Sequence, residues 1–257
     1  MNRPIATLTT DWGAQGFFVG MVKGALMQLV SGVQVVDVCH LVEPFDIATA
    51  SFVVRNACLG FPEGTVHIVD VASQPPFVAL RARGQYFICS DNGLPSLAFG
   101  DEVEAAVDIA VQPGGLYNFA AYKLYVDVAA RLMMGIRLED IGQPHGPMLN
   151  KQVLGYVQQE GHYRLYVRYV DRYGNAYLGM THREFEDLRQ GRPFTIETRS
   201  LKTSRLSTNY YAEPEASQMG LQFTVSATGY LELAICRAPI SQLEGLEVGS
   251  SVLLHFD

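Results

Sequence analysis

The first half of the chain alternates short apolar runs with segments in which apolar residues recur every three or four positions. The short runs have the length of buried strands, and the longer period is that of a helix packed on one side. We expect strands at residues 5–11, 33–40, 65–70 and 105–111, a hairpin at 77–90 that turns at Gly84, and helices at 45–58, at 125–135 and from Phe17 onward. Buried strands that alternate with helices predict a mostly parallel sheet with helices on both faces.

The pattern changes after Pro147, where short alternating runs separated by glycine and serine turns replace the helical segments. Such closely spaced strands predict a small antiparallel barrel or sandwich. The expected strands are 153–169 (two strands joined at 159–161), 194–197, 221–225, 230–236 and 251–256, with a long exposed loop at 204–217. We therefore predict an α/β domain at residues 1–147 and a smaller all-β, barrel-like domain at residues 152–257.

Composition and charge exclude several functional classes. The net charge is −7 and no basic run occurs, so nucleic acid is not an expected partner. No apolar run reaches membrane-spanning length and no signal peptide opens the chain, which predicts no membrane partner and a cytoplasmic protein. The four cysteines form no Cys-x-x-Cys pair and fit reduced thiols. No two histidines have the spacing of a helical metal pair, so no metal site is expected.

A carboxylate and a glycine-rich turn stand together where the first strand ends. Asp11 follows that strand, and open α/β sheets bind small polar ligands at such strand ends. Its two acceptor oxygens suit a vicinal diol such as a ribose. Gly13, Gly16, Gly20 and Gly24 follow, with neither the Walker nor the dinucleotide spacing. The alternative reading is a tight strand-to-helix turn with a solvated Asp11, and this segment by itself leaves both open.

Polar residues elsewhere have plainer interpretations. Asp91 and Asn92 precede Gly93 and predict a turn, with a direct ligand contact as the alternative. His40 and His67 lie in or beside apolar strands, where a hydrogen-bonded core imidazole is the ordinary role.

Six segments carry a resemblance that extends over nearly the whole chain: residues 9–24, 37–45, 61–67, 90–94, 170–175 and 228–234. In this order they resemble the motifs of the family that contains the S-adenosyl-L-methionine (SAM) hydroxide adenosyltransferases, the fluorinase and the chlorinase. The resemblance implies an N-terminal α/β domain and a C-terminal β-barrel-like domain. It also implies a homotrimer that holds SAM between the N-terminal domain of one subunit and the C-terminal domain of the next, with SAM or adenosine as ligand and no other cofactor.

The resemblance assigns roles to individual residues. Asp11 would hold the ribose hydroxyls, Phe45 would pack on the ligand, and Phe119 would lie beside the reacting carbon. The implied reaction is an in-line displacement at the 5′ carbon of SAM, with hydroxide giving adenosine and methionine. The remaining assigned residues are Asp171, for the methionine ammonium, and Tyr173 and Asn175, for the adenosine or methionine pocket.

The residues that activate water in the hydroxide enzymes are only partly present. The resemblance implies an Asp-Arg-His set, of which Asp70 remains, while Phe77 and Ala120 stand at the Arg and His positions. Ala121 stands where the halogenases have their halide-site Ser. Asp70 is either a remaining catalytic base or a strand-end residue that caps the next turn, and both interpretations stay open.

Three functions follow from this pattern. The first is a SAM hydroxide adenosyltransferase with weak or absent activity, since an isolated carboxylate is a weak base at neutral pH unless burial raises its pKa. The second is a non-catalytic protein that binds or senses SAM or adenosine. The third is another reaction or nucleophile in the same pocket, because the loop at residues 71–77 is apolar and could admit a different acceptor.

Overall fold

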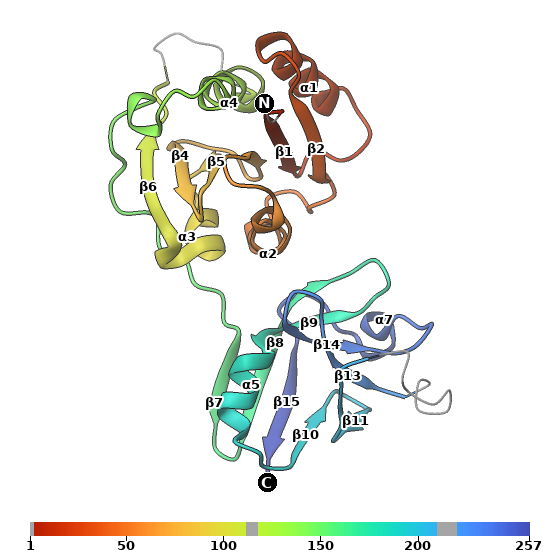
Figure 1. Cartoon of the computed structure of the whole chain (residues 1–257). Helices are drawn as coiled ribbons and strands as arrows, with labels where there is room; N and C mark the ends of the chain where they lie inside the picture. Colours follow the sequence, from red (N-terminus) through yellow and green to blue (C-terminus); the bar gives the residue numbers. More distant parts are fainter. Residues whose placement is uncertain (1–2, 112–117, 210–219) are drawn as a thin grey trace. The chain divides into compact units, whose positions relative to one another are not determined.

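The computed structural model describes residues 3–111, 118–209 and 220–257. The chain divides into two compact units, Met1–Gln152 and Val153–Asp257 (Figure 1). Within the described ranges, no helix has both the length and the apolar character that crossing a membrane requires.

In the described part of the first unit, six strands form one sheet with the order β2-β1-β3-β5-β4-β6. The first four of these strands pair in parallel, whereas β4 pairs antiparallel with both β5 and β6. The sheet is therefore mixed, because the hairpin that turns at Gly84 reverses the chain direction at one side. Its strands are β1 (Ile5–Thr10), β2 (Gln34–Cys39), β3 (Val66–Asp70), β4 (Phe77–Ala82), β5 (Gln85–Ser90) and β6 (Val103–Asp108).

Two apolar clusters cover this sheet, one on each face. Along β4, Ala79 joins the cluster that contains α1 and α4, whereas its neighbours Val78 and Leu80 join the cluster that contains α2 and α3. This alternation is the two-residue period of a strand buried on both sides. The helices are α1 (Phe18–Leu29), α2 (Ile47–Ala57), α3 (Leu94–Phe99) and α4 (Val126–Met133), with short helical turns η1 (Cys58–Gly60), η2 (Gly100–Glu102), η3 (Ala121–Tyr125) and η4 (Leu138–Asp140).

The helix expected at 125–135 begins earlier than its apolar pattern indicates. A π-helical turn, η3, leads directly into α4 and extends the helical segment back to Ala121. The wider turn brings Ala121 and Tyr125 into the same core. This segment follows Phe119 and Ala120, so it fixes two positions that matter for the candidate site.

Among the described residues of the second unit, nine strands form one sheet that curls into a half-barrel. Its order is β11-β10-β15-β8-β9-β14-β13-β12, and β7 pairs with β8 beside this path. All of these pairings are antiparallel except the one between β12 and β13. The strands are β7 (Tyr156–Gln159), β8 (His162–Val170), β9 (Ala176–Thr181), β10 (Phe194–Glu197), β11 (Lys202–Thr203), β12 (Leu206–Ser207), β13 (Gln222–Val225), β14 (Tyr230–Ala234) and β15 (Ser251–Phe256).

Two expectations for the second unit were wrong. The unit is not all-β, because it contains α5 (His182–Arg189) and α7 (Ile240–Glu244). A capping box starts α5: the Thr181 hydroxyl accepts from the Glu184 backbone N–H, and the Glu184 carboxylate accepts from the Thr181 N–H. The loop expected at 204–217 contains β12 in its described part, and residues 210–217 lie outside the described residues.

Two glycines allow β7 and β9 to meet beside β8. A Cβ on Gly155 would lie 2.2 Å from the backbone oxygen of Gly179, and one on Gly179 would lie 2.3 Å from the Cα of Gly155. Only glycine permits such a close approach of two backbones. The long strand β8 can therefore pair with β7 along its first half and with β9 along its second half.

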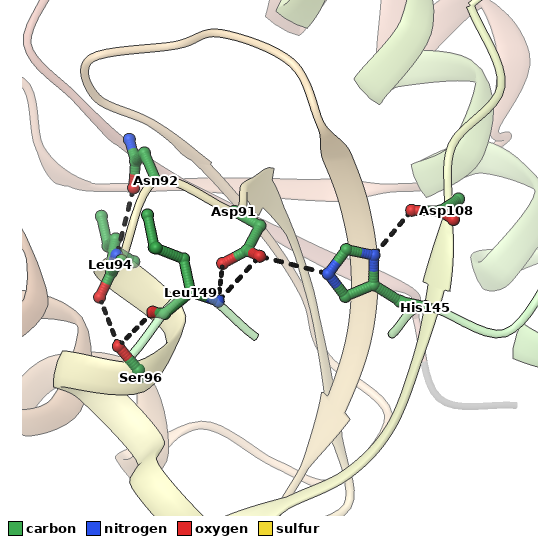
Figure 2. Close-up of polar contacts among 8 residues, drawn as sticks. Asp91, Asn92, Leu94, Ser96, Asp108, His145 and Leu149 are labelled. Atoms are coloured by element: carbon green, nitrogen blue, oxygen red, sulfur yellow. Dashed lines mark hydrogen bonds and ion pairs between the residues drawn. The ribbon is translucent and has the colours of Figure 1, made fainter. Parts of the chain in front are cut away.

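In the first unit, a half-buried histidine holds the segment that follows α4 in place. His145 lies between two carboxylates, with its Nε2 3.2 Å from Asp91 and its Nδ1 2.6 Å from Asp108 (Figure 2). The Asp91 carboxylate also accepts from the backbone N–H of Leu149 at 2.9 and 3.1 Å. The hydroxyl of Ser96 donates to the Leu149 carbonyl at 2.8 Å. These contacts hold the segment against the ends of β5 and β6.

Asn92 completes the turn expected at this position. Its side-chain oxygen accepts from the Leu94 N–H at 3.1 Å, and its side-chain amide donates to the carbonyls of Val71 and Ala72 (Figure 2 shows the first contact). Asp91 and Asn92 thus serve as structural groups that join neighbouring loops.

We expect the contribution of His145 to stability to depend on pH. Burial lowers its pKa, but the hydrogen bonds and charges of Asp108 and Asp91 outweigh burial and raise the pKa above 6.5. A raised pKa means that the stabilisation is complete below the unfolded-state value and is lost as pH rises through the folded-state value. His145→Gln should therefore lower the free energy of unfolding by about 1–3 kcal/mol at about pH 5.5 and by less at about pH 8.5.

Thermal and urea unfolding of both proteins across this pH range measures the difference. His162→Gln is the matched control, because His162 bonds to Gln159 on an exposed hairpin. Equal destabilisation by His145→Gln at both pH values would contradict an ionic role for the imidazole.

Candidate functional site

Asp11 joins the loops that follow three neighbouring parallel strands. It follows β1, and its Oδ2 accepts from the backbone N–H of Phe45 at 3.0 Å and from that of Ala72 at 3.1 Å. Phe45 and Ala72 lie in the loops after β2 and β3, and both have positive φ angles, 70° and 49°. Such angles are unfavourable for these side chains, so the carboxylate stabilises two strained turns at once. In the described part of the chain, Oδ1 of Asp11 has no hydrogen-bond partner.

Aromatic rings surround this strand end. Phe45 is 77% exposed, which is unusual for a large apolar side chain and leaves its ring open to a flat ligand. Phe119 packs at 4.8 Å between ring centroids against both Trp12 and Phe18. Trp12 also stacks on His40 at 6.4 Å. The structure thus gathers Asp11, Phe45 and Phe119 in the first unit, as parts of one set of loops.

Asp70, at the end of β3, is a buried carboxyl with one unsatisfied oxygen. The residue is 3% exposed, and its Oδ2 accepts from the Trp12 indole N–H at 2.9 Å. Its Oδ1 is buried without a hydrogen-bond partner among the described residues. The pKa of Asp70 is raised to about 6, chiefly by burial and to a smaller extent by the charge of Asp11, while the Ser73 hydroxyl and the Trp12 indole act in the opposite direction. A carboxyl with this pKa can accept and release a proton near neutral pH.

A cavity of about 230 Å³ lies beside Asp70. Polar and apolar side chains both contribute to its wall, and no lysine, arginine or histidine is among the described residues that line it. The lining residues are Asp70, Ser73, Gln74, Pro75, Phe77, Val111, Asn118, Phe119 and Ala120.

Hydrogen bonds to neighbouring buried residues fix the side chains and backbone that form the wall of this cavity. The Tyr125 hydroxyl lies 3.3 Å from the hydroxyls of both Ser73 and Ser90, and Ser90 accepts from the Gln74 N–H at 2.9 Å. Tyr125 is fully buried, and burial raises its pKa well above the usual value, so its hydroxyl stays protonated. The loop at residues 71–77 is therefore fixed at several points, which favours a preformed site.

The other predicted residues lie in the second unit. Asp171 follows β8, and its carboxylate accepts from the Tyr173 N–H at 2.9 Å and from the backbone and side-chain N–H groups of Asn175 at 2.9 and 3.2 Å. Tyr173 is 81% exposed. Tyr173 and Asn175 line a cavity of about 550 Å³, together with Arg172, Gln222, Ala234, Ile235, Cys236, Arg237, Ala238, Pro239 and Gln242. In the structure Asp171 thus shapes the turn that presents Tyr173 and Asn175.

The sequence did not indicate the hydroxyl and indole groups that support the cavity and contact Asp70. Ser73, Ser90 and Tyr125 gave no signal, because a hydroxyl in an apolar segment has many ordinary explanations. Trp12 had one: it is the only tryptophan in the chain and directly follows Asp11. In the described residues, no group of three or more His, Cys, Asp or Glu side chains has an arrangement that could hold a metal ion.

The fold is shared with solved structures. A crystal structure of an uncharacterized conserved protein from Thermotoga maritima superposes with a TM-score of 0.85 and 22% identity, covering 98% of this chain and 99% of that one. At the sequence level, the models of the SAM hydroxide adenosyltransferase N-terminal and C-terminal domains match residues 6–142 and 165–253. The chain therefore belongs to the SAM hydroxide adenosyltransferase family.

Two relatives of known activity match over almost their full lengths. The (R)-S-adenosyl-L-methionine hydrolase of Thermus thermophilus is 27% identical in an alignment that covers 98% of this chain and 99% of the relative. A fluorinase of Nocardia brasiliensis is 23% identical, over 98% of this chain and 96% of its own. These matches confirm the resemblance that the six segments indicated.

We expect tryptophan fluorescence to report the ionisation of Asp70. Trp12 is the sole tryptophan and donates to Asp70, so a change in the carboxyl charge alters the surroundings of the indole. The emission should change with a midpoint near pH 6, the pKa of Asp70, and Asp70→Asn should remove this transition.

Two controls accompany this titration. His40 stacks on Trp12, so His40→Gln must leave the transition in place. Because the folded-state pKa of Asp70 is raised, its ionisation costs stability as pH rises through about 6, and Asp70→Asn should unfold at a higher temperature than the parent at about pH 8. A transition that survives in Asp70→Asn would contradict the assignment.

Proposed function

We propose that this protein binds SAM in the first unit and displaces methionine from its 5′ carbon, with water as nucleophile, to give adenosine and methionine. The observation that carries the proposal is Asp70: a buried carboxyl with a pKa of about 6 and an unpartnered oxygen, in the wall of a cavity. Membership of the SAM hydroxide adenosyltransferase family and the match to the hydrolase of Thermus thermophilus support the choice of substrate.

In this proposal, different residues of the first unit bind SAM and assist the displacement. Asp11, with Oδ1 unoccupied, accepts from the ribose hydroxyls, and the exposed ring of Phe45 packs on the ligand. Phe119 lies in the wall of the Asp70 cavity and packs beside the 5′ carbon, where it limits access of further water. Asp70 Oδ1 accepts a proton from the attacking water, while the electron pair of the breaking C5′–S bond goes to sulfur. Alignment supplies much of the acceleration, since a sulfonium is already a good leaving group.

Residues of the second unit complete the proposed ligand contacts. Tyr173 and Asn175 line the larger cavity, and the turn formed by Asp171 presents them. We propose that they bind the adenosine or methionine part of the ligand. Asp171 contributes by forming this turn and by attracting the methionine ammonium. We further propose that the protein is a homotrimer.

A second candidate function is a non-catalytic protein that binds or senses SAM or adenosine. It is favoured by the side chains at two positions where the family resemblance implies Arg and His. Phe77 and Ala120 stand there, each 5% exposed, so neither charge nor imidazole assists Asp70 from these positions. General acid–base assistance is worth about 10²–10⁴ in rate, so a hydrolase without it should be slow.

Incubation of the purified protein with SAM, followed by chromatography and mass spectrometry, distinguishes the two. The hydrolase proposal expects methionine and adenosine in equal amounts, and a loss of about 100-fold or more in turnover for Asp70→Asn with SAM binding retained. Asp11→Ala should weaken binding of both SAM and adenosine, because it removes the ribose acceptor and releases the Phe45 loop.

Asp101→Asn is the matched control for the change in charge, since Asp101 lies exposed in η2. Calorimetric binding of SAM without any methionine release would establish the non-catalytic alternative. Absence of both binding and turnover, in protein that circular dichroism shows to be folded, would reject both functions.

A further inference from the structure

We propose that the cavity beside Asp70 also admits a small neutral alcohol or polyol, and that the protein transfers the adenosyl group from SAM to its hydroxyl oxygen. This inference rests on the proposed function, because it uses the same ligand and the same carboxyl. It differs in the acceptor, which becomes an organic molecule that carries its own carbon atoms into the cavity.

The size of the cavity is the first argument. A water molecule takes about 30 Å³ of liquid volume, and the cavity of about 230 Å³ is several times larger. The cavity therefore has room for an acceptor larger than water beside the 5′ end of SAM, which the proposed function places in the same cavity.

The composition of the wall is the second argument. Phe77, Phe119 and Val111 offer apolar surface to a short carbon chain. Ser73, Gln74 and Asn118 line the same cavity and can hydrogen-bond a hydroxyl. A wall of this mixed kind fits a small molecule with both carbon and hydroxyl groups, such as ethylene glycol or glycerol.

The unsatisfied oxygen of Asp70 selects the chemical class of the acceptor. A buried acceptor without a donor is costly, so Oδ1 favours a ligand that brings an O–H. A halide is disfavoured, because its charge would lie beside a carboxylate in a wall where the described residues include no cation. An amine would enter as an ammonium, pair with Asp70 and lose its nucleophilic electron pair. A neutral hydroxyl avoids both problems.

The transfer step balances without another reactant. The hydroxyl oxygen attacks the 5′ carbon as the C5′–S bond breaks, and the electron pair of that bond remains on sulfur as the thioether of methionine. The hydroxyl proton passes to Asp70 Oδ1 and then to solvent. The products are a 5′-O-alkyl adenosine and methionine, and nothing is oxidised or reduced.

The test is a product analysis with competing acceptors. The full-length protein is incubated with SAM in buffer alone, with ethylene glycol, with glycerol, and with sodium chloride or fluoride, and nucleosides and methionine are measured by mass spectrometry. Reactions without protein correct for spontaneous alkylation. We expect 5′-O-(2-hydroxyethyl)adenosine in the ethylene glycol reaction, with a share of total nucleoside that rises with the alcohol concentration, and no halogenated adenosine.

Cavity-filling variants connect this product to the site. Ala120 is buried in the wall, and Ala120→Leu should lower the ratio of alkyl adenosine to adenosine by about 10-fold, because a larger side chain leaves room for water but not for the alcohol. Ala110→Leu adds the same volume at an exposed position outside the wall and should leave the ratio unchanged. Asp70→Asn should lower the rate of formation of both products by about 100-fold or more.

Each outcome bears on the acceptor separately from the proposed hydrolysis. Methionine release with adenosine as the sole nucleoside at every alcohol concentration overturns the inference and leaves the hydrolase proposal standing. Methionine release only in the presence of alcohol supports the inference and overturns water as the nucleophile. An alkyl product whose share is unaffected by Ala120→Leu overturns the assignment to this cavity, and no methionine in any reaction overturns both proposals.

Discussion

The candidate site depends on one carboxylate that accepts two backbone hydrogen bonds. Asp11 Oδ2 binds the N–H groups of Phe45 and Ala72, residues with positive φ in the loops after β2 and β3. Charge-assisted hydrogen bonds of this kind can offset the strain of such angles. One of these hydrogen bonds fixes the backbone of Phe45, whose ring is exposed. The other fixes the beginning of the loop that lines the Asp70 cavity. The loops that follow three neighbouring strands are thereby positioned together.

Burial gives the carboxyl group of Asp70 a higher pKa than a solvent-exposed carboxyl has. Asp70 is adjacent in space to Asp11, since the Asp11 N–H lies 3.4 Å from the Asp70 carbonyl, yet its carboxyl is buried while Asp11 remains partly exposed. Desolvation disfavours its charged form and raises its pKa to about 6. Two nearby carboxyls thus suit different tasks, one as an acceptor for a ligand and the other as a proton acceptor.

Much of the fold could be predicted from the sequence, and the misses have identifiable causes. The central strands β1, β3, β4 and β5 were found because they are buried on both faces and are rich in apolar residues. The helix α5 was missed although Thr181 and Glu184 form a capping-box pattern, because the segment is short and strongly polar between strands. The start of the helical segment at Ala121 was missed because a π-helical turn departs from the ordinary helical period.

The sequence by itself determined the family, the two-part organisation and the identity of Asp11, Phe45, Phe119 and Asp70 as residues of interest, because motifs and apolar periods are local in the chain. Only the tertiary structure decided what those residues contact and how deeply they are buried. The hydrogen bonds of Asp11, the unpartnered oxygen of Asp70 and the support of its cavity by Tyr125 join positions far apart in sequence. Burial and charge at a site depend on every segment packed around it, and no local pattern contains that sum.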